Sequence, residues 1–341
     1  MSVLADFVLG SADRVVLPIA SYPGTALTEA TVRAVVTDPA AQTAAAVALH
    51  QRYSTRVVQS AMDLSAEAEA FGAAVTMGDA EVPAVCAPIV HNQAEVDALA
   101  VPEPGASRTG VFLETVRRLK HLPGRPLVLG GCIGPFTLAA RLAGMTEACR
   151  DTLIDPPLVH ALVAKCVRFL IPYVRAFRDA GADAVLMAEP AAGLLSPRGL
   201  ATFSSAYVRQ IVAAVDDGRF TLMLHNCGAL LTHLPAMLES GVKIFHFGAP
   251  MDVPAALAKV GPEVVVCGNL DPTAVFVQST AEQVTARAAA LLDATREHRH
   301  FVLSSGCDLP AAVPLANLDA FYAAVHSYSL LDSKGPTECI R

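Results

Sequence analysis

From about residue 120 onward, short apolar runs alternate with longer segments of helical periodicity. The apolar runs are nearly continuous instead of alternating with polar residues, which is typical of parallel strands buried on both faces. Several helical segments open with Ser, Thr or Pro, residues that favour the first positions of a helix. The predicted strands are 126–131, 184–188, 221–225, 243–247, 263–267 and 300–303, and the predicted helices are 157–180, 197–214, 229–240 and 281–297.

The repeated spacing of these units favours a (β/α)8 barrel over a doubly wound sheet. Segments 56–60 and 82–88 predict two earlier strands, and no early G-x-G-x-x-G turn indicates a dinucleotide-binding sheet. A barrel of this kind reaches 341 residues as one domain. We therefore predict an α/β fold with a (β/α)8 TIM barrel over 51–341. Residues 1–50, with one helix over 40–52, form an N-terminal helical extension packed on the barrel.

Charge and hydropathy exclude several classes of protein. The net charge is −7 and the 25 basic residues are dispersed, which argues against a nucleic-acid partner. The hydrophobic fraction of 53% is rich in scattered alanine, and no window has the roughly 18 uninterrupted apolar residues of a membrane span. The amino terminus has no basic start before its short apolar run, unlike a signal peptide. We expect a soluble, cytoplasmic protein.

The chain has eight cysteines without regular spacing. They do not form the framework of a small secreted domain, so metal ligation or simple burial is the better expectation. Cys86, Cys149 and Cys166 are expected to be small buried apolar residues.

Five of the predicted strands end in polar turns, most of them rich in glycine. The turns are Gly131 to Pro135, Glu189-Pro190, His225 to Gly228, Cys267 to Pro272 and Ser304 to Asp308. In a βα barrel these turns open on one face, where the chemistry of the fold is found. The sequence therefore predicts a functional site at the carboxyl ends of the strands.

His225, Cys227 and Cys307 are the candidate metal ligands at this face. Catalytic Zn²⁺ prefers imidazole and thiolate, with three protein ligands and one open position. The alternative left open by the residues alone is a hydrogen-bonded histidine beside two buried thiols. Cys267 is a rival ligand to Cys307, and His246 is either a partner behind the ligands or a core histidine.

Three other polar residues at the strand ends are candidates with open alternatives. Glu189 is predicted as a catalytic proton acceptor or a weak fourth ligand, or else as an anchor for a neighbouring loop. Asn269 and Asp271 are predicted cofactor-binding residues, although such side chains more often bond their own backbone in turns.

The chain resembles the uroporphyrinogen decarboxylase superfamily over nearly its whole length. The segments that carry the resemblance are MDLSAEAEAFG (62–72), GADAVLMAEP (181–190), LHNCG (224–228), CGNLDP (267–272) and SSGCDLP (304–310). Within the superfamily they are most similar to the cobalamin-dependent methyltransferases typified by methylcobalamin:coenzyme M methyltransferase. The resemblance implies a (β/α)8 barrel and zinc bound by His225, Cys227 and Cys307.

Two departures from the superfamily concern the substrate. The decarboxylases hold porphyrin carboxylates with an M-R-Q-A-G-R segment, whereas 17–27 of this chain contains no arginine. Asp63 falls where the decarboxylase has its essential aspartate, and we predict it as a second catalytic residue. The strand around His246 lacks the expected terminal aspartate, which leaves substrate contacts there open.

The resemblance thus implies a zinc-dependent methyltransferase that moves a methyl group between a corrinoid and a zinc-activated thiol such as coenzyme M. The corrinoid, methylcobalamin or a separate corrinoid protein, would be a co-substrate, because no cobalamin-binding domain is recognisable. The alternatives are demethylation of a small methylated substrate onto a corrinoid protein, a metal-independent decarboxylase centred on Asp63, and a noncatalytic barrel with structural zinc.

Overall fold

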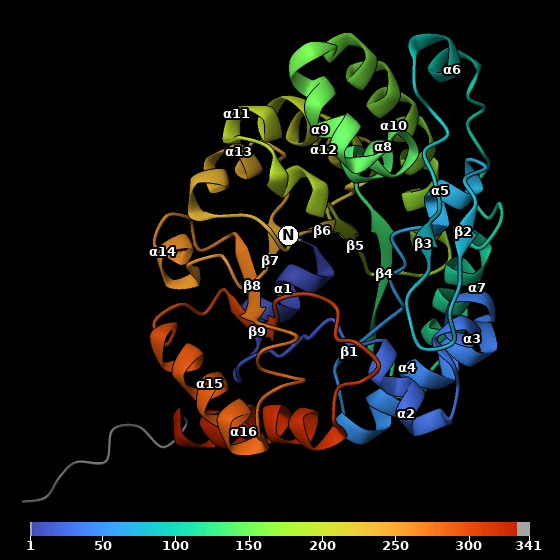
Figure 1. The fold of residues 1–341 in the computed structure, drawn as a ribbon. Coiled ribbons are helices and arrows are strands. Elements are labelled where there is room, and N and C mark those ends of the chain that lie inside the picture. Colours follow the sequence, from blue (N-terminus) through green and yellow to red (C-terminus); the bar gives the residue numbers. More distant parts are fainter. Residues whose placement is uncertain (1, 333–341) are drawn as a thin grey trace, which may run out of the picture.

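The computed structural model describes residues 2–332. Seven parallel strands curl into an incomplete barrel, with helices around the outside (Figure 1). The strands, in their order around the sheet, are β1 (Val57–Gln59), β4 (Leu127–Ile133), β5 (Ala184–Ala188), β6 (Thr221–Asn226), β7 (Ile244–Phe247), β8 (Val265–Leu270) and β9 (Phe301–Ser305). A separate antiparallel pair is formed by β2 (Val75–Thr76) and β3 (Ala84–Val85).

Sixteen α-helices lie within the described residues. They are α1 (Val3–Gly10), α2 (Thr25–Thr28), α3 (Val32–Thr37), α4 (Pro39–Tyr53), α5 (Ala66–Ala70), α6 (Gln93–Ala98), α7 (Thr109–Lys120), α8 (Pro135–Ala143), α9 (Met145–Ile154), α10 (Pro156–Asp179), α11 (Pro197–Leu200), α12 (Ala206–Val215), α13 (Leu234–Leu238), α14 (Val253–Leu257), α15 (Ala281–Ala294) and α16 (Leu315–Asp332). α1 covers the amino-terminal end of the strands, because its apolar residues join the core inside the barrel and Val3 N–H donates to the Arg219 carbonyl just before β6.

The prediction of an α/β fold with a parallel, barrel-like sheet is confirmed. The prediction of a closed barrel with eight strands is wrong, because the sheet has seven strands. The place beside β9 is taken by residues 15–17, where Val16 forms an isolated parallel bridge to Leu303. Pro18 follows at once and has no N–H to extend a ladder. No ladder pairs this segment with β1 within residues 2–332, and the Gln59 side chain donates a hydrogen bond to the Pro18 carbonyl.

The predicted strand 82–88 is also not a barrel strand. Only two of its residues pair, in β3 against β2, outside the barrel. Pro83 and Pro88 lack the N–H groups that a ladder requires, so the run stays short. The other seven predicted strands correspond to β1 and β4 to β9.

The predicted helices are mostly confirmed, with two that are interrupted. Segment 157–180 is α10, 281–297 contains α15, and 40–52 lies within α4. Segment 197–214 is broken by a π-helical turn at Ala201–Ser205, and 229–240 contains only a 3₁₀ turn and the short α13. The boundary at residue 50 between an extension and the barrel stays a prediction.

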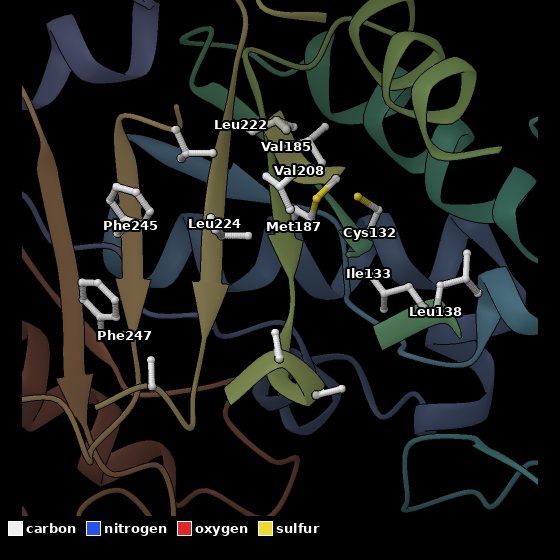
Figure 2. Close-up of a cluster of buried hydrophobic side chains, with 14 of the residues drawn as sticks. Cys132, Ile133, Leu138, Val185, Met187, Val208, Leu222, Leu224, Phe245 and Phe247 are labelled. Atoms are coloured by element: carbon white, nitrogen blue, oxygen red, sulfur yellow. The ribbon is translucent and has the colours of Figure 1, made fainter. Parts of the chain in front are cut away.

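Each strand sends alternate side chains to two different cores. One face packs against the helices, as the side chains of β4 to β7 with those of α8 and α12 show in Figure 2. The other face fills the barrel interior with apolar side chains, among them Leu17, Val57, Leu129, Leu186, Met223, Ile244, Val265 and Val302. This alternation decides where the polar residues at the strand ends point.

α10 is the one described helix long and apolar enough to cross a membrane, judged by length and composition. Half of its apolar window is buried, and it packs against α8, α9 and α12. Its composition is therefore that of a core helix.

We expect Phe177→Ala to lower the free energy of unfolding by about 3–5 kcal/mol. Phe177 on α10 is fully buried and its ring lies against Gly130 of β4, so truncation leaves a cavity between helix and sheet. Leu153→Ala is the control, because Leu153 is 84% exposed on α9. Urea unfolding followed by circular dichroism measures both, and equal effects of the two variants would contradict this packing.

Candidate metal centre

His225, Cys227 and Cys307 come together at the carboxyl ends of β6 and β9. His225 lies two residues after Met223 on β6, so both side chains face the barrel interior. Cys227 follows the end of β6, and Cys307 follows the end of β9. Their ligating atoms all lie within 4.8 Å of one another, with 3.6 Å between Cys307 Sγ and His225 Nε2. His225 is buried and both cysteines are partly buried.

This donor set suits a tetrahedral zinc site. Zn–S bonds of about 2.3 Å and Zn–N bonds of about 2.0–2.1 Å place neighbouring S and N ligands about 3.6 Å apart in a tetrahedron. The Cys307–His225 distance has that value. Two thiolates and one imidazole are also the ligand types that zinc prefers, and three protein ligands leave a fourth position for a substrate.

Close backbone packing beside Cys227 requires a glycine. A Cβ on Gly248, in the turn after β7, would lie 2.1 Å from the Cys227 carbonyl oxygen. The turns after β6 and β7 can therefore approach one another only with glycine at this position.

The two thiols are electrostatically coupled. Hydrogen bonding from Cys307 lowers the pKa of Cys227 well below that of a free thiol, and His225 lowers it further. The same interaction raises the pKa of Cys307, since removing its proton would place two thiolates side by side. One thiolate thus forms readily, whereas the second needs a cation beside it.

A chain of hydrogen bonds holds the histidine from behind. His225 and His246 are register partners on β6 and β7, and their Nδ1 atoms are 2.8 Å apart. His246 Nε2 is 2.7 Å from Ser304 Oγ, which donates to the Leu17 carbonyl at 2.6 Å. Burial lowers the pKa of His246, so its ring is neutral.

The Leu17 carbonyl at the end of these hydrogen bonds determines which atom carries the proton in each of them. The Leu17 oxygen can only accept, so Ser304 donates to it and accepts from His246 Nε2–H. His246 Nδ1 then accepts the proton that His225 carries on Nδ1. The Nε2 lone pair of His225 is left free toward the two cysteines, as a metal ligand requires. The alternative that His246 is a partner behind the ligands matches these contacts.

Glu189 lies on the opposite face of the sheet from His225. It follows Val185 and Met187, which face the helices, and its carboxylate accepts from the N–H groups of Phe136 and Thr137 at 2.9 and 2.8 Å. Ser204 Oγ is a third donor. Burial raises the pKa of Glu189, and these donors partly offset the rise. The contacts match the anchoring alternative, at the start of α8, and the catalytic or ligand role of Glu189 stays a prediction.

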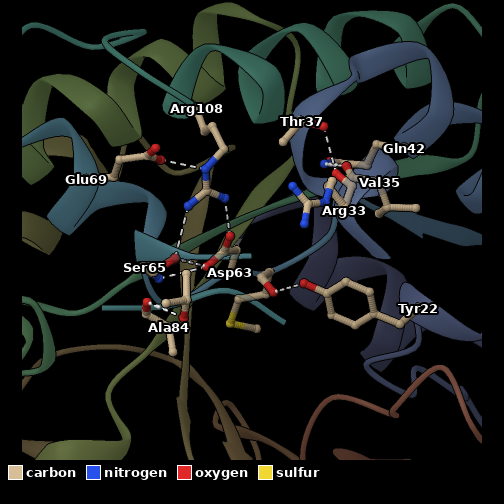
Figure 3. A network of polar contacts seen from close by, with 12 residues as sticks. Tyr22, Arg33, Val35, Thr37, Gln42, Asp63, Ser65, Glu69, Ala84 and Arg108 are labelled. Carbon is tan, nitrogen blue, oxygen red and sulfur yellow. Dashed lines mark hydrogen bonds and ion pairs between the residues drawn. The ribbon is translucent and has the colours of Figure 1, made fainter. Parts of the chain in front are cut away.

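Asp63 is held in a buried ion pair (Figure 3). One carboxylate oxygen accepts from the N–H and Oγ of Ser65 at 2.8 and 2.6 Å, and the other pairs with Arg108, which also pairs with Glu69. The catalytic role of Asp63 stays a prediction, but its carboxylate has no free oxygen directed at the cysteines.

Asn269 and Asp271 bond backbone groups in neighbouring turns. Asn269 donates to the carbonyls of Gly248 and Met251 at 2.9 and 2.7 Å. Asp271 accepts from the N–H groups of the residues two and three positions further on. These contacts match the turn-forming alternative, and the cofactor-binding role of both residues stays a prediction.

The remaining cysteines differ in environment. Cys267 is buried in the interior beside His246, where burial raises its pKa, and it is outside the group of three ligands. Cys166 is buried as expected and Cys149 is partly exposed. Cys86 is exposed, so its prediction as a buried residue is wrong: it lies beside β3, outside the barrel.

A pocket of about 350 Å³ opens beside the ligand group. His225, Cys227 and Cys307 line it together with Tyr22, Arg141 and Asp308. Sequence reasoning missed Arg141, because it sits in an ordinary helical stretch with no motif to mark it. A parallel barrel with a His-Cys-Cys group and a pocket at the carboxyl ends of its strands defines the class: an α/β barrel protein with a candidate thiolate metal centre.

The chain belongs to the uroporphyrinogen decarboxylase (URO-D) family, whose sequence profile matches residues 23–328. It is 30% identical to "Methylcobamide:CoM methyltransferase MtbA" of Methanosarcina mazei over 284 residues, which is 82% of each chain. It is 31% identical to "Uroporphyrinogen decarboxylase" of Pseudomonas paraeruginosa over 252 residues, 71% of this chain and 70% of the relative. The solved "methyltransferase from Methanosarcina mazei" shares the fold, with a TM-score of 0.86 at 21% identity over 95% of this chain and 97% of that one.

We expect Glu189→Gln to lower the free energy of unfolding by about 1–3 kcal/mol, because an amide keeps only one of two acceptor oxygens at the start of α8. Bound zinc per chain should not change. Glu114→Gln, on the exposed face of α7, is the control. Thermal unfolding and metal analysis measure the two effects, and loss of zinc in a stably folded Glu189→Gln protein would restore the ligand role.

Proposed function

We propose that this protein transfers a methyl group from a corrinoid to a small thiol that is activated by Zn²⁺ at His225, Cys227 and Cys307. The observation that carries the proposal is the convergence of two thiols and an oriented imidazole within 4.8 Å beside a pocket. The relatives named as methylcobamide:CoM methyltransferases support the same reaction class. Sequence identity alone does not favour this reaction, because the named decarboxylases are equally similar to the chain.

The proposed reaction moves the methyl group as a cation equivalent. The thiol gives up its proton and forms a sulfur–carbon bond, while both electrons of the cobalt–carbon bond stay on cobalt. Zn²⁺ in this site would strip the proton from the thiol and keep its sulfur electron-rich. Two cysteinates and a neutral histidine form a formally neutral site, which preserves more nucleophilicity than a three-histidine set would.

The residues of the chain have distinct tasks in this proposal. His225 and the two cysteines hold the metal, and His246 with Ser304 keeps His225 in the tautomer with a free Nε2. The corrinoid approaches the open face of the pocket, carried by a separate corrinoid protein. Cytoplasmic location and the absence of a nucleic-acid partner stay predictions.

The other functions remain distinguishable from this one. The reverse reaction, demethylation of a small methylated substrate onto a corrinoid, uses the same site, and structural zinc would give no turnover in either direction. A metal-independent decarboxylase centred on Asp63 is less favoured, because Arg108 and Ser65 already bind its carboxylate.

We expect the purified protein to bind one Zn²⁺ per chain, and Cys227→Ser or Cys307→Ser to lose most of it, because serine is a poor zinc ligand. Cys86→Ser, at an exposed cysteine, is the control and should keep its metal. Elemental analysis after dialysis measures the stoichiometry. Full zinc in the Cys307→Ser protein would remove this residue from the site.

We expect the protein to demethylate methylcobalamin only when a thiol is present. The change in the visible spectrum of the corrinoid measures this reaction. Removing the metal with a chelator should abolish it, and adding Zn²⁺ should restore it. Activity of the zinc protein only with methylated donors and a reduced corrinoid would reverse the assigned direction. Inactivity with every donor and acceptor would favour structural zinc.

We expect His246→Phe to weaken zinc binding about 10- to 100-fold, because His225 then loses the acceptor that orients it. His246→Asn, whose side-chain oxygen can still accept a hydrogen bond, should recover part of the affinity. Competition with a chromogenic chelator measures both. Equal affinities of the phenylalanine variant and the unchanged protein would show that the hydrogen-bond chain does not position the ligand.

A further inference from the structure

Asn226 lies between His225 and Cys227 in sequence, but its side chain points to the opposite face of the sheet from His225. It follows Leu224 by two residues on β6, so it faces the helices while His225 faces the barrel interior. The residue is only 1% exposed. A buried amide costs free energy unless it is hydrogen-bonded, so the partners of Asn226 indicate what it stabilises.

The amide nitrogen of Asn226 extends the pairing between β5 and β6 by one bond. Glu189 N–H donates to the His225 carbonyl at 2.8 Å, as in a regular parallel ladder. If the ladder continued, the Glu189 carbonyl would accept from the N–H of Cys227. Within residues 2–332, its donors are Asn226 Nδ2 at 2.9 Å and Ala192 N–H at 3.2 Å. The side chain of Asn226 thus replaces the N–H of Cys227, and β6 ends at Asn226.

The amide oxygen of Asn226 folds the chain around Cys227. Oδ1 accepts from Gly228 N–H at 3.1 Å, which makes an Asx turn over residues 226–228. In an extended strand, alternate residues lie about 6.4–6.8 Å apart and their side chains run side by side. A turn at Cys227 brings its sulfur toward His225, and the ligating atoms of the metal group lie within 4.8 Å of one another. One amide therefore ends the strand and bends the turn that carries a ligand.

Close backbone packing holds this amide in place. A Cβ on Gly193, in the 3₁₀ helix Pro190–Leu194 after β5, would lie 2.6 Å from Asn226 Oδ1. The backbone at residue 193 therefore packs directly on the amide. Gly248 packs as closely on the carbonyl of Cys227 from the side of β7. The turn that carries Cys227 is thus fixed from both neighbouring strands.

We infer that Asn226 is a positioning residue that sets the direction from which Cys227 reaches the metal. This inference rests on the metal site of the proposed function. Asn226 contacts neither the metal nor the substrate, since it acts through the backbone of the turn. His225 is held separately by His246, and Cys307 comes from β9, so loss of the amide displaces Cys227 alone.

Metal binding by variants tests the inference without any methyl donor. We expect Asn226→Ala to weaken Zn²⁺ binding about 10- to 100-fold, the effect of losing a residue that orients a ligand. Asn226→Ser, whose hydroxyl can still accept from Gly228 N–H, should recover part of the affinity. Asn317→Ala is the matched control, because Asn317 is also buried and donates to two carbonyls, those of Phe276 and Ser279. It should lose stability and keep its zinc affinity, as measured by thermal unfolding and competition with a chromogenic chelator.

The protein loaded with Co²⁺ reports directly on the thiolates. A thiolate bound to Co²⁺ gives a charge-transfer absorption in the near ultraviolet. This absorption, per bound metal, should fall in Asn226→Ala toward the level of Cys227→Ser and should stay unchanged in Asn317→Ala. Gly193→Ala, which presses on the amide from the other side, should lower it as well. Gly10→Ala, where an added Cβ meets nothing within 4 Å, is the control for that change.

The outcomes separate this inference from the methyl-transfer proposal. If the Asn226 variants lose affinity and absorption but no form of the protein methylates a thiol, the proposed reaction fails and the positioning role stands. A loss of zinc affinity in Asn226→Ala no greater than in Asn317→Ala would overturn the inference. An unchanged protein that binds neither ion would overturn it together with the metal site. Should Asn226→Ala fail to fold, Asn226→Ser and Gly193→Ala provide the same comparison, and normal affinity and absorption in both would refute the role.

Discussion

The register between β6 and β7 is the constraint on which the candidate site depends. It sets His225 beside His246 in the barrel interior, so that the two rings share a hydrogen bond. A slip of one residue in β6 would turn His225 toward the helices and bring Asn226 inside. The alternate apolar residues of the two strands prevent that slip, since Met223 and Ile244 fill the interior while Leu224 and Phe245 pack against helices. Packing of the barrel thereby decides the geometry of its ligands.

The geometry of the candidate site also depends on the amino-terminal segment. Residues 15–17 occupy the place of an eighth strand and make only one bridge, yet the Leu17 carbonyl ends the chain of hydrogen bonds that orients His225. Ile19 N–H also bonds Ser305 Oγ, two residues before Cys307. An irregular strand therefore has two roles: it covers the open side of the sheet, and its carbonyl directs the protons at the site.

Much of the fold and the core of the site could be predicted from the sequence, because continuous apolar runs mark buried parallel strands and glycine-flanked cysteines mark their ends. The face of the sheet to which each polar side chain points could not be predicted from the sequence. Both faces of these strands are apolar, so no polar alternation tells that Glu189 faces α8 while His225 faces the interior. The pairing of Asp63 depends on Arg108, which is distant in sequence and carries no motif. The prolines of 82–88 limit strand pairing there to the two residues of β3.

The distribution of charge separates this site from that of a decarboxylase more clearly than sequence identity does. Two carboxylates close to the pocket are committed to structure, Asp63 to Arg108 and Glu189 to the start of α8, whereas Asp308 lines the pocket itself. The other polar groups that line the pocket include an imidazole, two coupled thiols and the guanidinium of Arg141. The soft donors among them favour a thiophilic metal. The thiols and the oriented imidazole at the carboxyl ends of the strands are thus suited to chemistry on sulfur.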